Sequence, residues 1–373
     1  MLRFLCWIVV ALGLLASGGT ALSLSRRPHW FLRLWDFPRV QLALTATAAG
    51  LLYAKFFSRG RPADRAFLVT TAASVAWQAR KIQPYTRLAP VRVQRSRRGR
   101  NADGSRGAAT FRLVISNVLM ENQQHDRLLQ VIRESAPDVV LTLEMNEAWA
   151  KALRPLHREF PHVFEHPQEN YYGMVLLSRL PLIDPKIRFL VQDDIPSVHT
   201  GIELPSGDHV FLHGLHPRPP EPIRHQDSTP RDAELVVLGK TIRETGPRPT
   251  IVAGDLNDVA WADTSELFLR ISGLLDPRMG RGFYNSYHAD HRLLRYPLDH
   301  VFHSNHFRLV DLQRLPPIGS DHFPMLVELS YEPESEGEQE PTHEKAGDET
   351  EAEEKLETQA EAASTGDDRS LTE

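Results

Sequence analysis

The chain has 373 residues, with 43 Lys and Arg against 48 Asp and Glu and a formal net charge of −5 at pH 7. Its single cysteine, Cys6, excludes an intrachain disulfide and a cysteine-based metal site. The 17 histidines include no H-E-x-x-H motif of the common zinc sites, which disfavours zinc.

Charge divides the chain into three blocks. Residues 1–110 contain 18 Lys and Arg and 3 Asp and Glu, residues 111–331 contain 22 and 29, and residues 332–373 contain 3 and 16. Only the middle block has the balanced composition that buries a core, and its length of about 220 residues suits one domain. We therefore predict a single globular domain at 111–331.

Three apolar runs, at about 4–24, 40–57 and 66–79, precede this domain. The first carries no charge and is long enough to cross a bilayer, whereas the third contains Thr, Ser and Gln. A cleaved signal peptide explains the first run alone and leaves the second unexplained. We expect residues 1–82 to form a membrane region with two or three transmembrane helices.

Both flanks of the domain are strongly charged. Residues 83–110 have the composition of a basic linker, whose arginines either contact anionic headgroups or stay solvated. This linker contains a cluster of five arginines: Arg92, Arg95, Arg97, Arg98 and Arg100. The cluster favours a cytoplasmic domain, whereas three spans with a cytoplasmic N-terminus would place the domain outside. The side of the membrane on which the domain lies therefore stays open. The acidic tail, 332–373, has almost no large apolar residue and is expected to be disordered.

Apolar runs in the middle block predict many strands and a few helices. The predicted strands are 111–115, 139–143, 173–177, 209–212, 250–253 and 325–329. The predicted helices are 125–135 and a segment that follows the cap Ser228 and runs to about residue 244. This pattern indicates an α/β sandwich of two packed sheets covered by helices.

Polar side chains follow several of these runs. Asp255 and Asn257 come directly after a strand, where a carboxylate beside an amide suits phosphoryl chemistry, although an Asx turn explains any single Asp-x-Asn. Asp321 and His322 are adjacent in sequence, and Asp299 is the expected partner that orients His322 as a general base. A capped loop is the alternative explanation.

Oxygen ligands dominate the remaining set. Glu144 follows the run Val-Val-Leu-Thr-Leu and, if buried, needs a cation, an Arg or a Lys as partner, and Asn117 ends the preceding strand in the same way. Together with Asp321 they suit Mg²⁺ or Mn²⁺ better than zinc or copper. His216, after another strand, is placed to protonate a leaving oxygen.

The order of these residues resembles the endonuclease/exonuclease/phosphatase superfamily, which includes pancreatic deoxyribonuclease, apurinic endonucleases, bacterial sphingomyelinases and inositol-polyphosphate phosphatases. The resemblance covers about residues 111–331 and implies a four-layer α/β sandwich, with two mixed β-sheets flanked by helices, here preceded by transmembrane helices. It also implies Mg²⁺-dependent phosphoester hydrolysis by activated water. Apurinic endonucleases generally lack a histidine where His216 stands, which disfavours abasic-site repair.

The resemblance also suggests a role for each residue. Asn117, Glu144 and Asp321 are similar to metal-side residues. His322 with Asp299 resembles the general-base dyad of the family, and His216 resembles its second histidine. Asp255 and Asn257 resemble the pair that positions nucleophile and phosphate. Tyr172 and Arg231 are candidates for contact with substrate phosphate, with surface packing as the alternative.

These observations predict a membrane-anchored, Mg²⁺-dependent hydrolase of a phosphoester or phosphodiester, integral to the bacterial inner membrane. The −7 charge of residues 111–331 favours a lipid or small phosphoester over nucleic acid, because nonspecific DNA binding needs basic phosphate contacts. A Mg²⁺-dependent endonuclease or exonuclease acting on DNA or RNA is the alternative. A non-catalytic membrane scaffold would have lost the polar set, which is intact.

Overall fold

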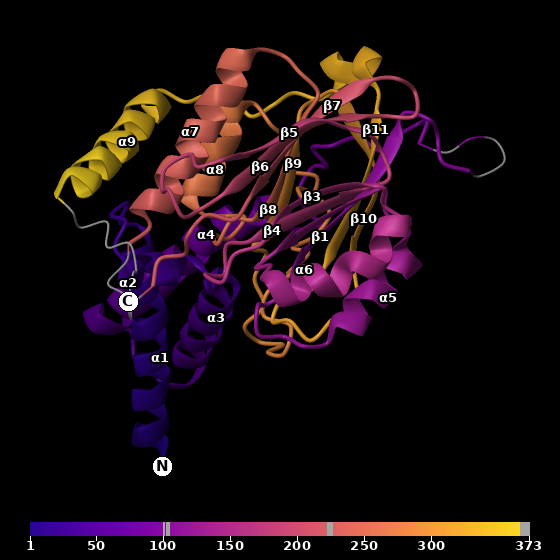
Figure 1. Cartoon of the computed structure of the whole chain (residues 1–373). Helices are drawn as coiled ribbons and strands as arrows, with labels where there is room; N and C mark the ends of the chain where they lie inside the picture. The colour runs from indigo at the N-terminus through magenta and orange to yellow at the C-terminus, as the bar shows by residue number, and fades with distance from the viewer. Residues whose placement is uncertain (100, 102–104, 222–226, 366–373) are drawn as a thin grey trace.

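The computed structural model describes residues 1–99, 101, 105–221 and 227–365 (Figure 1). Residues 100 and 102–104 of the expected linker, and residues 366–373 of the expected tail, lie outside this description. Two β-sheets form the centre of the molecule, and the N-terminal helices project below them in Figure 1.

Both sheets are mixed. The first has the strand order β10-β11-β1-β2-β4-β3, and the second has the order β5-β6-β7-β8-β9. The pairs β1/β2 and β7/β8 are parallel, and all other pairs are antiparallel. The strands are β1 (Thr110–Asn117), β2 (Val139–Leu143), β3 (His162–His166), β4 (Met174–Ser178), β5 (Leu182–Arg188), β6 (Ser197–Glu203), β7 (His209–Leu215), β8 (Thr250–Asp255), β9 (Asp299–His303), β10 (Phe307–Arg314) and β11 (Met325–Tyr331).

The main core lies between the sheets, because alternate residues of each central strand face the other sheet. Leu113 and Ile115 of β1 share one buried cluster with Leu212 of β7 and Ile251 of β8. The intervening residue Val114 faces the other way, into the helices that cover the first sheet. Residues buried on both faces explain why these strands are almost continuously apolar in sequence.

Helices cover the outer face of each sheet. On the first sheet, α5 (His125–Ser135) and α6 (Glu147–Leu153) bury Ile132 and Trp149 against β1 and β2. On the second, α7 (Thr229–Thr245) and α8 (Asp263–Ser272) bury Leu235 and Phe268 against β8 and β9. Helix, sheet, sheet and helix thus form the four-layer α/β sandwich that the sequence predicted.

The N-terminal region contains three long helices that pack on one another: α1 (Leu2–Ser23), α3 (Arg39–Phe56) and α4 (Pro62–Ile82). Among the described residues, α1 is the one helix long and apolar enough to cross a membrane. The prediction of a second and third span is therefore not supported. Helix α4 is long enough to cross a membrane but not apolar enough, because it contains polar and charged residues that include Asp64, Arg80 and Lys81.

Short helical elements lie between and after the N-terminal helices, with the first two between α1 and α3 and the third after α4. They are α2 (Trp30–Arg33), η1 (Leu34–Asp36) and η2 (Gln83–Tyr85), while η3 (Arg154–Arg158) follows α6. The expected linker is partly packed into the domain rather than free, because Tyr85 and Val93 are fully buried. The hydroxyl of Tyr85 donates to the Ala260 carbonyl at 2.5 Å.

The prediction of a disordered acidic tail is wrong for residues 333–338 and 348–365. They form η4 (Pro333–Glu338) and α9 (Asp348–Thr365), and α9 packs on α7 and α8. Composition misses this helix because ion pairs hold much of it: Asp348 accepts two hydrogen bonds from Arg270, and Lys355 donates to the buried Asp232 at 2.8 Å. Its apolar contact with the domain is small: Ala352 joins one buried apolar cluster, and Leu356 packs against that cluster.

One buried carboxyl makes stability depend on pH. Glu234 of α7 is 3% exposed, and burial raises its pKa from 4.5 to about 8. The folded protein therefore retains a proton that the unfolded chain releases near pH 4.5, and it loses about 1.4 kcal/mol of stability per pH unit as pH rises from there towards 8.

We expect Glu234→Gln to remove this dependence. The difference in melting temperature between the variant and the parent should grow in favour of the variant from pH 5 to pH 8, as measured by thermal denaturation. Glu244→Gln, at an exposed position of the same helix, is the control. Parallel pH profiles for the Glu234 variant and the parent would contradict the assignment.

Candidate active site

The candidate site lies where the parallel strands of both sheets end. Asn117 ends β1, and Glu144 follows the last residue of its parallel neighbour β2. In the second sheet, His216 follows β7 and Asp255 ends the parallel β8. Parallel strands deliver their last residues to one edge, so each sheet contributes a pair of polar side chains to a shared rim.

Gly254 allows β8 to approach β7 closely at this rim. Its φ is +148°, and a Cβ at this position would lie 1.9 Å from the Leu215 carbonyl oxygen. A side chain would therefore separate the two strands just before Asp255 and His216. The glycine in the Gly254-Asp255-Leu256-Asn257 sequence is a packing requirement of the site.

Asn117 connects the two sheets. Its Nδ2 donates to Glu144 Oε1 at 2.7 Å and to Asp255 Oδ2 at 3.1 Å, and its Oδ1 accepts from the Leu119 amide. One amide group thus sets the separation of two buried carboxylates from different sheets. Burial raises the pKa of Glu144 to about 7 and that of Asp255 to about 6, because the charged forms lose solvation there.

Two residues of the rim have left-handed backbone conformations. Glu144 has φ of 60° and Asn257 has φ of 51°, values that non-glycine residues seldom adopt. The turn at Asn257 is held by its amide, which donates to Asp255 Oδ1 at 2.9 Å, and by its side chain, which donates to the Pro217 carbonyl at 2.9 Å. The loops after β7 and β8 are thereby fixed to each other.

His322 lies between two carboxylates. Its Nδ1 is 2.8 Å from Asp299 Oδ2, and its Nε2 is 3.4 Å from Asp255 Oδ2. Burial lowers the pKa of His322, but the charges of Asp299 and Asp255 more than reverse this and raise it to about 10. The expected pairing of His322 with Asp299 is present, and it leaves Nε2 as the nitrogen that faces the rim.

His216 lies on the other side of Asp255, with its Nε2 3.8 Å from Asp255 Oδ2. Burial, and then the charge of His322, lower its pKa to about 3, so it is neutral at pH 7 and carries one ring proton. The Tyr172 ring is 5.4 Å from it and is only 6% exposed. Tyr172 therefore packs beside His216. The Arg218 guanidinium lies 5.5 Å from the centre of the Tyr172 ring.

The donor set fits a hard divalent cation. Glu144, Asp255 and Asp299 are carboxylates with no Lys or Arg ion pair among the described residues, and Asp299 Oδ1 has no hydrogen-bond partner there. Ligand atoms of Asp255, Asp299 and His322 lie within 4.8 Å of one another. The one positive charge of His322 does not balance the three carboxylates, and a cation offsets the cost of the remaining negative charge.

The expected metal-side set differs in detail from this cluster. Asn117 and Glu144 are in contact, as described, but Asn117 presents its nitrogen and not its oxygen to the carboxylates. Asp321 is partly exposed, and its charge helps to raise the pKa of Glu144. Asp299 Oδ2 accepts from His322 and its Oδ1 has no partner among the described residues, whereas Glu144 accepts from Asn117 at Oε1 and from the Met120 amide at Oε2.

Arg231 does not fit the expected contact with substrate. Its side chain is 1% exposed and lies behind the rim, where Nη2 pairs with Asp232 at 2.8 Å and with Asp258 at 3.1 Å. Its Nη1 donates to the Asn257 carbonyl at 2.8 Å. Arg231 therefore supports the Asn257 turn from the interior.

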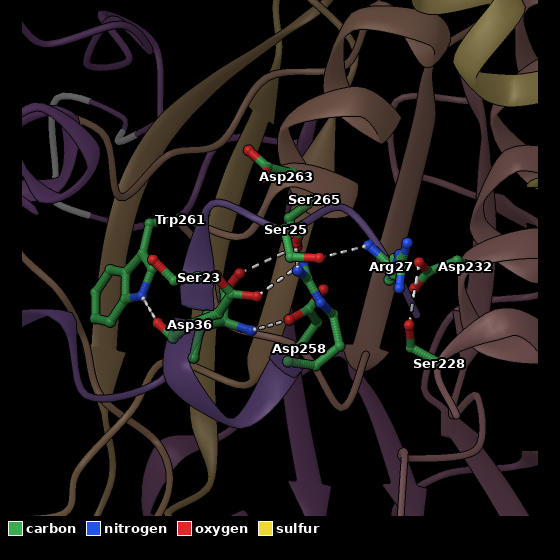
Figure 2. Close-up of polar contacts among 12 residues, drawn as sticks. Ser23, Ser25, Arg27, Asp36, Ser228, Asp232, Asp258, Trp261, Asp263 and Ser265 are labelled. Atoms are coloured by element: carbon green, nitrogen blue, oxygen red, sulfur yellow. Dashed lines mark hydrogen bonds and ion pairs between the residues drawn. The ribbon is translucent and has the colours of Figure 1, made fainter. Parts of the chain in front are cut away.

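The same network reaches the N-terminal segment. In Figure 2, Asp36 lies beside Asp258 and Trp261, the loop residues that follow Asn257. The Trp261 indole donates to the Asp36 carbonyl at 2.7 Å, and the Asp36 carboxylate pairs with Arg33 and Arg39. The segment between α1 and α3 is thus fastened directly to the loop that carries Asn257.

Several supporting residues have no clear signal in the sequence. The Ser286 hydroxyl accepts from the Asp299 amide at 3.0 Å, and the Tyr287 ring lies 5.0 Å from His322. Both come from an irregular segment without apolar periodicity. Ser320 does have a signal in the sequence, since it directly precedes Asp321. Its hydroxyl donates to the Asn117 carbonyl at 2.9 Å and joins the loop of His322 to β1.

Comparison with known families identifies the class of protein. The family model described as "Endonuclease/Exonuclease/phosphatase family" matches residues 115–322, which include all ten predicted site residues. The chain belongs to this family, and it is a metal-dependent hydrolase of phosphoesters. No curated protein sequence matches it.

Solved structures of similar fold include D. rerio TDP2 complexed with a single-strand DNA product, at 17% identity and a TM-score of 0.49, covering 60% of this chain and 99% of that one. The human Nocturnin catalytic domain matches at 16% identity and a TM-score of 0.48, and the match covers 60% of this chain and 95% of that one. Sphingomyelinase C from Streptomyces griseocarneus matches at 15% identity and a TM-score of 0.44, and the match covers 59% of this chain and 99% of that one. These similarities do not identify the substrate.

The geometry predicts the effect of changing the central residues. His322→Ala and Asp255→Asn should each lower kcat by about a hundredfold or more, because Nε2 of His322 and Oδ2 of Asp255 face the position of the reacting groups. Hydrolysis of an activated aryl phosphodiester with Mg²⁺ by the full chain measures the effect.

Asp126→Asn, at an exposed position of α5, is the control for loss of a carboxylate. Circular dichroism checks that both active-site variants remain folded. Rates like those of the parent protein in either variant would refute these roles.

Proposed function

We propose that the protein is a membrane-anchored hydrolase that uses Mg²⁺ or Mn²⁺ to cleave a phosphoester or phosphodiester of a lipid or another small molecule. The observation that carries the proposal is the position of the catalytic rim beside the N-terminal helices. The supporting features are the apolar surface of α1, an apolar loop at the rim, and the arrangement of His322, Asp255 and His216.

Helix α1 supports the membrane anchor. It is 22 residues long, its mean hydropathy over an 18-residue window is 2.0, and two thirds of that window are not buried. Phe4, Trp7, Leu14 and Leu15 are each more than half exposed. An apolar surface of this kind on a protruding helix favours insertion into a bilayer over contact with water.

A loop at the rim, residues 289–295, brings apolar side chains close to the N-terminal helices; it is called the rim loop below. Leu293 is 84% exposed and Leu294 is 50% exposed. The Leu293 carbonyl accepts from the Gln41 side chain of α3 at 2.6 Å, and the Ala289 amide of the same loop donates to the Asp321 carbonyl at 2.6 Å. The loop therefore joins a site residue to the N-terminal helices and presents two leucines to a lipid surface.

The side chains support hydrolysis by water. Asp299 holds Nδ1 of His322, so Nε2, once it has lost its own proton, accepts the proton of the attacking water while Asp255 orients that water. The water oxygen adds to phosphorus, the ester P–O bond breaks, and the proton returns to the leaving oxygen. His216, neutral and buried, donates a hydrogen bond from its ring N–H to a phosphate oxygen and keeps its proton.

A divalent cation held by Glu144 and Asp321, beside Asn117, would offset the buried carboxylates, polarise the phosphoester and weaken the hold on the His322 proton. The oxygen donors favour Mg²⁺ or Mn²⁺. His322, with its raised pKa, stores the proton in the resting site.

A nuclease is the second candidate. The rim loop carries basic groups that can contact phosphates of a nucleic acid, including Arg292, and Arg295 over the Phe323 ring at 4.9 Å. The acidic balance of residues 111–331 opposes this candidate, since each phosphate contact requires a positive group.

Replacement of Glu144 tests the metal assignment. Glu144→Gln should raise the Mg²⁺ concentration needed for half-maximal activity by about tenfold, because an amide is a weaker ligand than a carboxylate. A metal titration of aryl phosphodiester hydrolysis measures it, with the exposed Glu147→Gln as control. An unchanged titration would count against Glu144 as a ligand.

A change in the rim loop tests the substrate class. Leu293→Ser with Leu294→Ser should slow hydrolysis of phospholipid in vesicles by about tenfold and leave hydrolysis of a soluble aryl diester unchanged, since only the vesicle reaction uses apolar contact. Leu88→Ser, 91% exposed outside this loop, is the control.

The same protein should be assayed on supercoiled DNA and on RNA. Cleavage of nucleic acid together with no turnover of any phospholipid or small phosphoester would replace the lipid proposal with the nuclease.

A further inference from the structure

A cavity of about 400 Å³ lies on the outer face of the second sheet, between strands β5 to β7 and the C-terminal turns of α7. Its lining includes His209 and Phe211 at the start of β7 and Thr250 at the start of β8. His216 and Asp255 lie at the opposite ends of these two strands. The cavity is therefore at the edge of the sheet away from the catalytic rim.

Basic side chains dominate the charge of this cavity. The lining includes two arginines, a lysine and three histidines: Lys186, Arg188, His199, His209, His213 and Arg248. Asp184 is the one carboxylate among the described lining residues, and it pairs with Lys186 at 2.6 Å near the surface. Neither Arg188 nor Arg248 forms an ion pair with a described carboxylate. Two guanidinium charges are thus left for a ligand.

The hydrogen bonds define the protonation of two histidines in the wall. His199 and His213 are opposite each other on β6 and β7, with 2.7 Å between their Nδ1 atoms, so one of the two must donate. The Ser197 hydroxyl donates to the Arg188 carbonyl and therefore accepts from Nε2 of His199 at 2.8 Å. A neutral His199 then accepts at Nδ1, and His213 donates from its own Nδ1.

His213 is consequently left with an unprotonated Nε2. Burial lowers the pKa of His199 to about 3 and that of His213 to about 4, so neither ring gains a second proton near pH 7. The charge of Arg188 acts in the same direction on both rings. The wall thus offers a neutral hydrogen-bond acceptor among positive groups, and no described residue donates to it.

We propose that this cavity binds a phosphate group that keeps a P–OH near pH 7, which is the free inorganic phosphate ion, since a phosphomonoester loses that proton with a second pKa of about 6. The oxyanions of such a group pair with the guanidinium groups of Arg188 and Arg248, and its P–OH donates to Nε2 of His213. Sulfate has the same shape and charge as hydrogen phosphate but no proton to donate, so it leaves the His213 acceptor unsatisfied.

The C-terminal end of α7 opposes an anion at this position, because the carbonyl groups of a helix end carry partial negative charge. The hydroxyls of Thr241 and Thr245 donate to carbonyls of this helix. The two guanidinium groups outweigh the half charge of the helix end. The site is independent of the catalytic residues and of the proposed reaction.

Isothermal titration calorimetry on the full chain in detergent tests the proposal, with inorganic phosphate, glycerol phosphate and sulfate as probes at pH 7.5 and no divalent cation. We expect phosphate to bind about tenfold more tightly than sulfate. Glycerol phosphate, which is mostly without a P–OH at pH 7.5, should likewise bind more weakly than inorganic phosphate, and binding as tight as that of inorganic phosphate would overturn the role of the His213 acceptor. Equal binding of sulfate and phosphate would overturn the proposal.

Variants separate this site from the catalytic rim. Arg188→Met with Arg248→Met should weaken phosphate binding by about tenfold and leave aryl diester hydrolysis unchanged, while His322→Ala should retain phosphate binding. Arg127→Met, exposed on α5, is the control. Undiminished binding in the double variant would overturn the proposal, and the comparison with sulfate decides the question in the unaltered protein if that variant does not fold.

Discussion

The Asn117 side chain fixes the relation between the two halves of the sandwich at the point where chemistry occurs. Its nitrogen donates to Glu144 from its own sheet and to Asp255 from the other sheet. The two carboxylates would otherwise repel each other in a buried environment that already raises their pKa values. Asp255, held in this way, is also the carboxylate beside which His322 and His216 lie.

Much of the sandwich follows from the sequence because central strands are buried on both faces. The runs at 111–115, 139–143 and 250–253 are almost continuously apolar for that reason, and each ends in a polar residue of the site. Strands β3 and β5 escape prediction because they lie at sheet edges, where His162–His166 and Leu182–Arg188 mix polar and apolar residues and β5 contains a register shift.

The remaining parts of the site depend on contacts between distant segments. Asp299 and His322 are 23 positions apart, and their pairing is recognisable because both follow a motif, whereas the role of Arg231 depends on Asp258 and on the Asn257 carbonyl. Nothing local distinguishes a buried arginine at the first turn of a helix from a solvated one. The N-terminal segment, which contacts the same loop through Asp36, is likewise invisible to periodicity.

Helix α9 changes where the folded unit ends. Composition places the boundary at residue 331, yet Lys355 neutralises the buried Asp232, and Asp232 pairs with the Arg231 that supports the Asn257 turn. A chain shortened at 331 would leave Asp232 with Arg231 as its positive partner and Arg270 without Asp348, which would weaken the support of the loop that carries Asn257. The acidic segment is therefore a structural brace, and the catalytic loop is linked to residues nearly one hundred positions further along the chain.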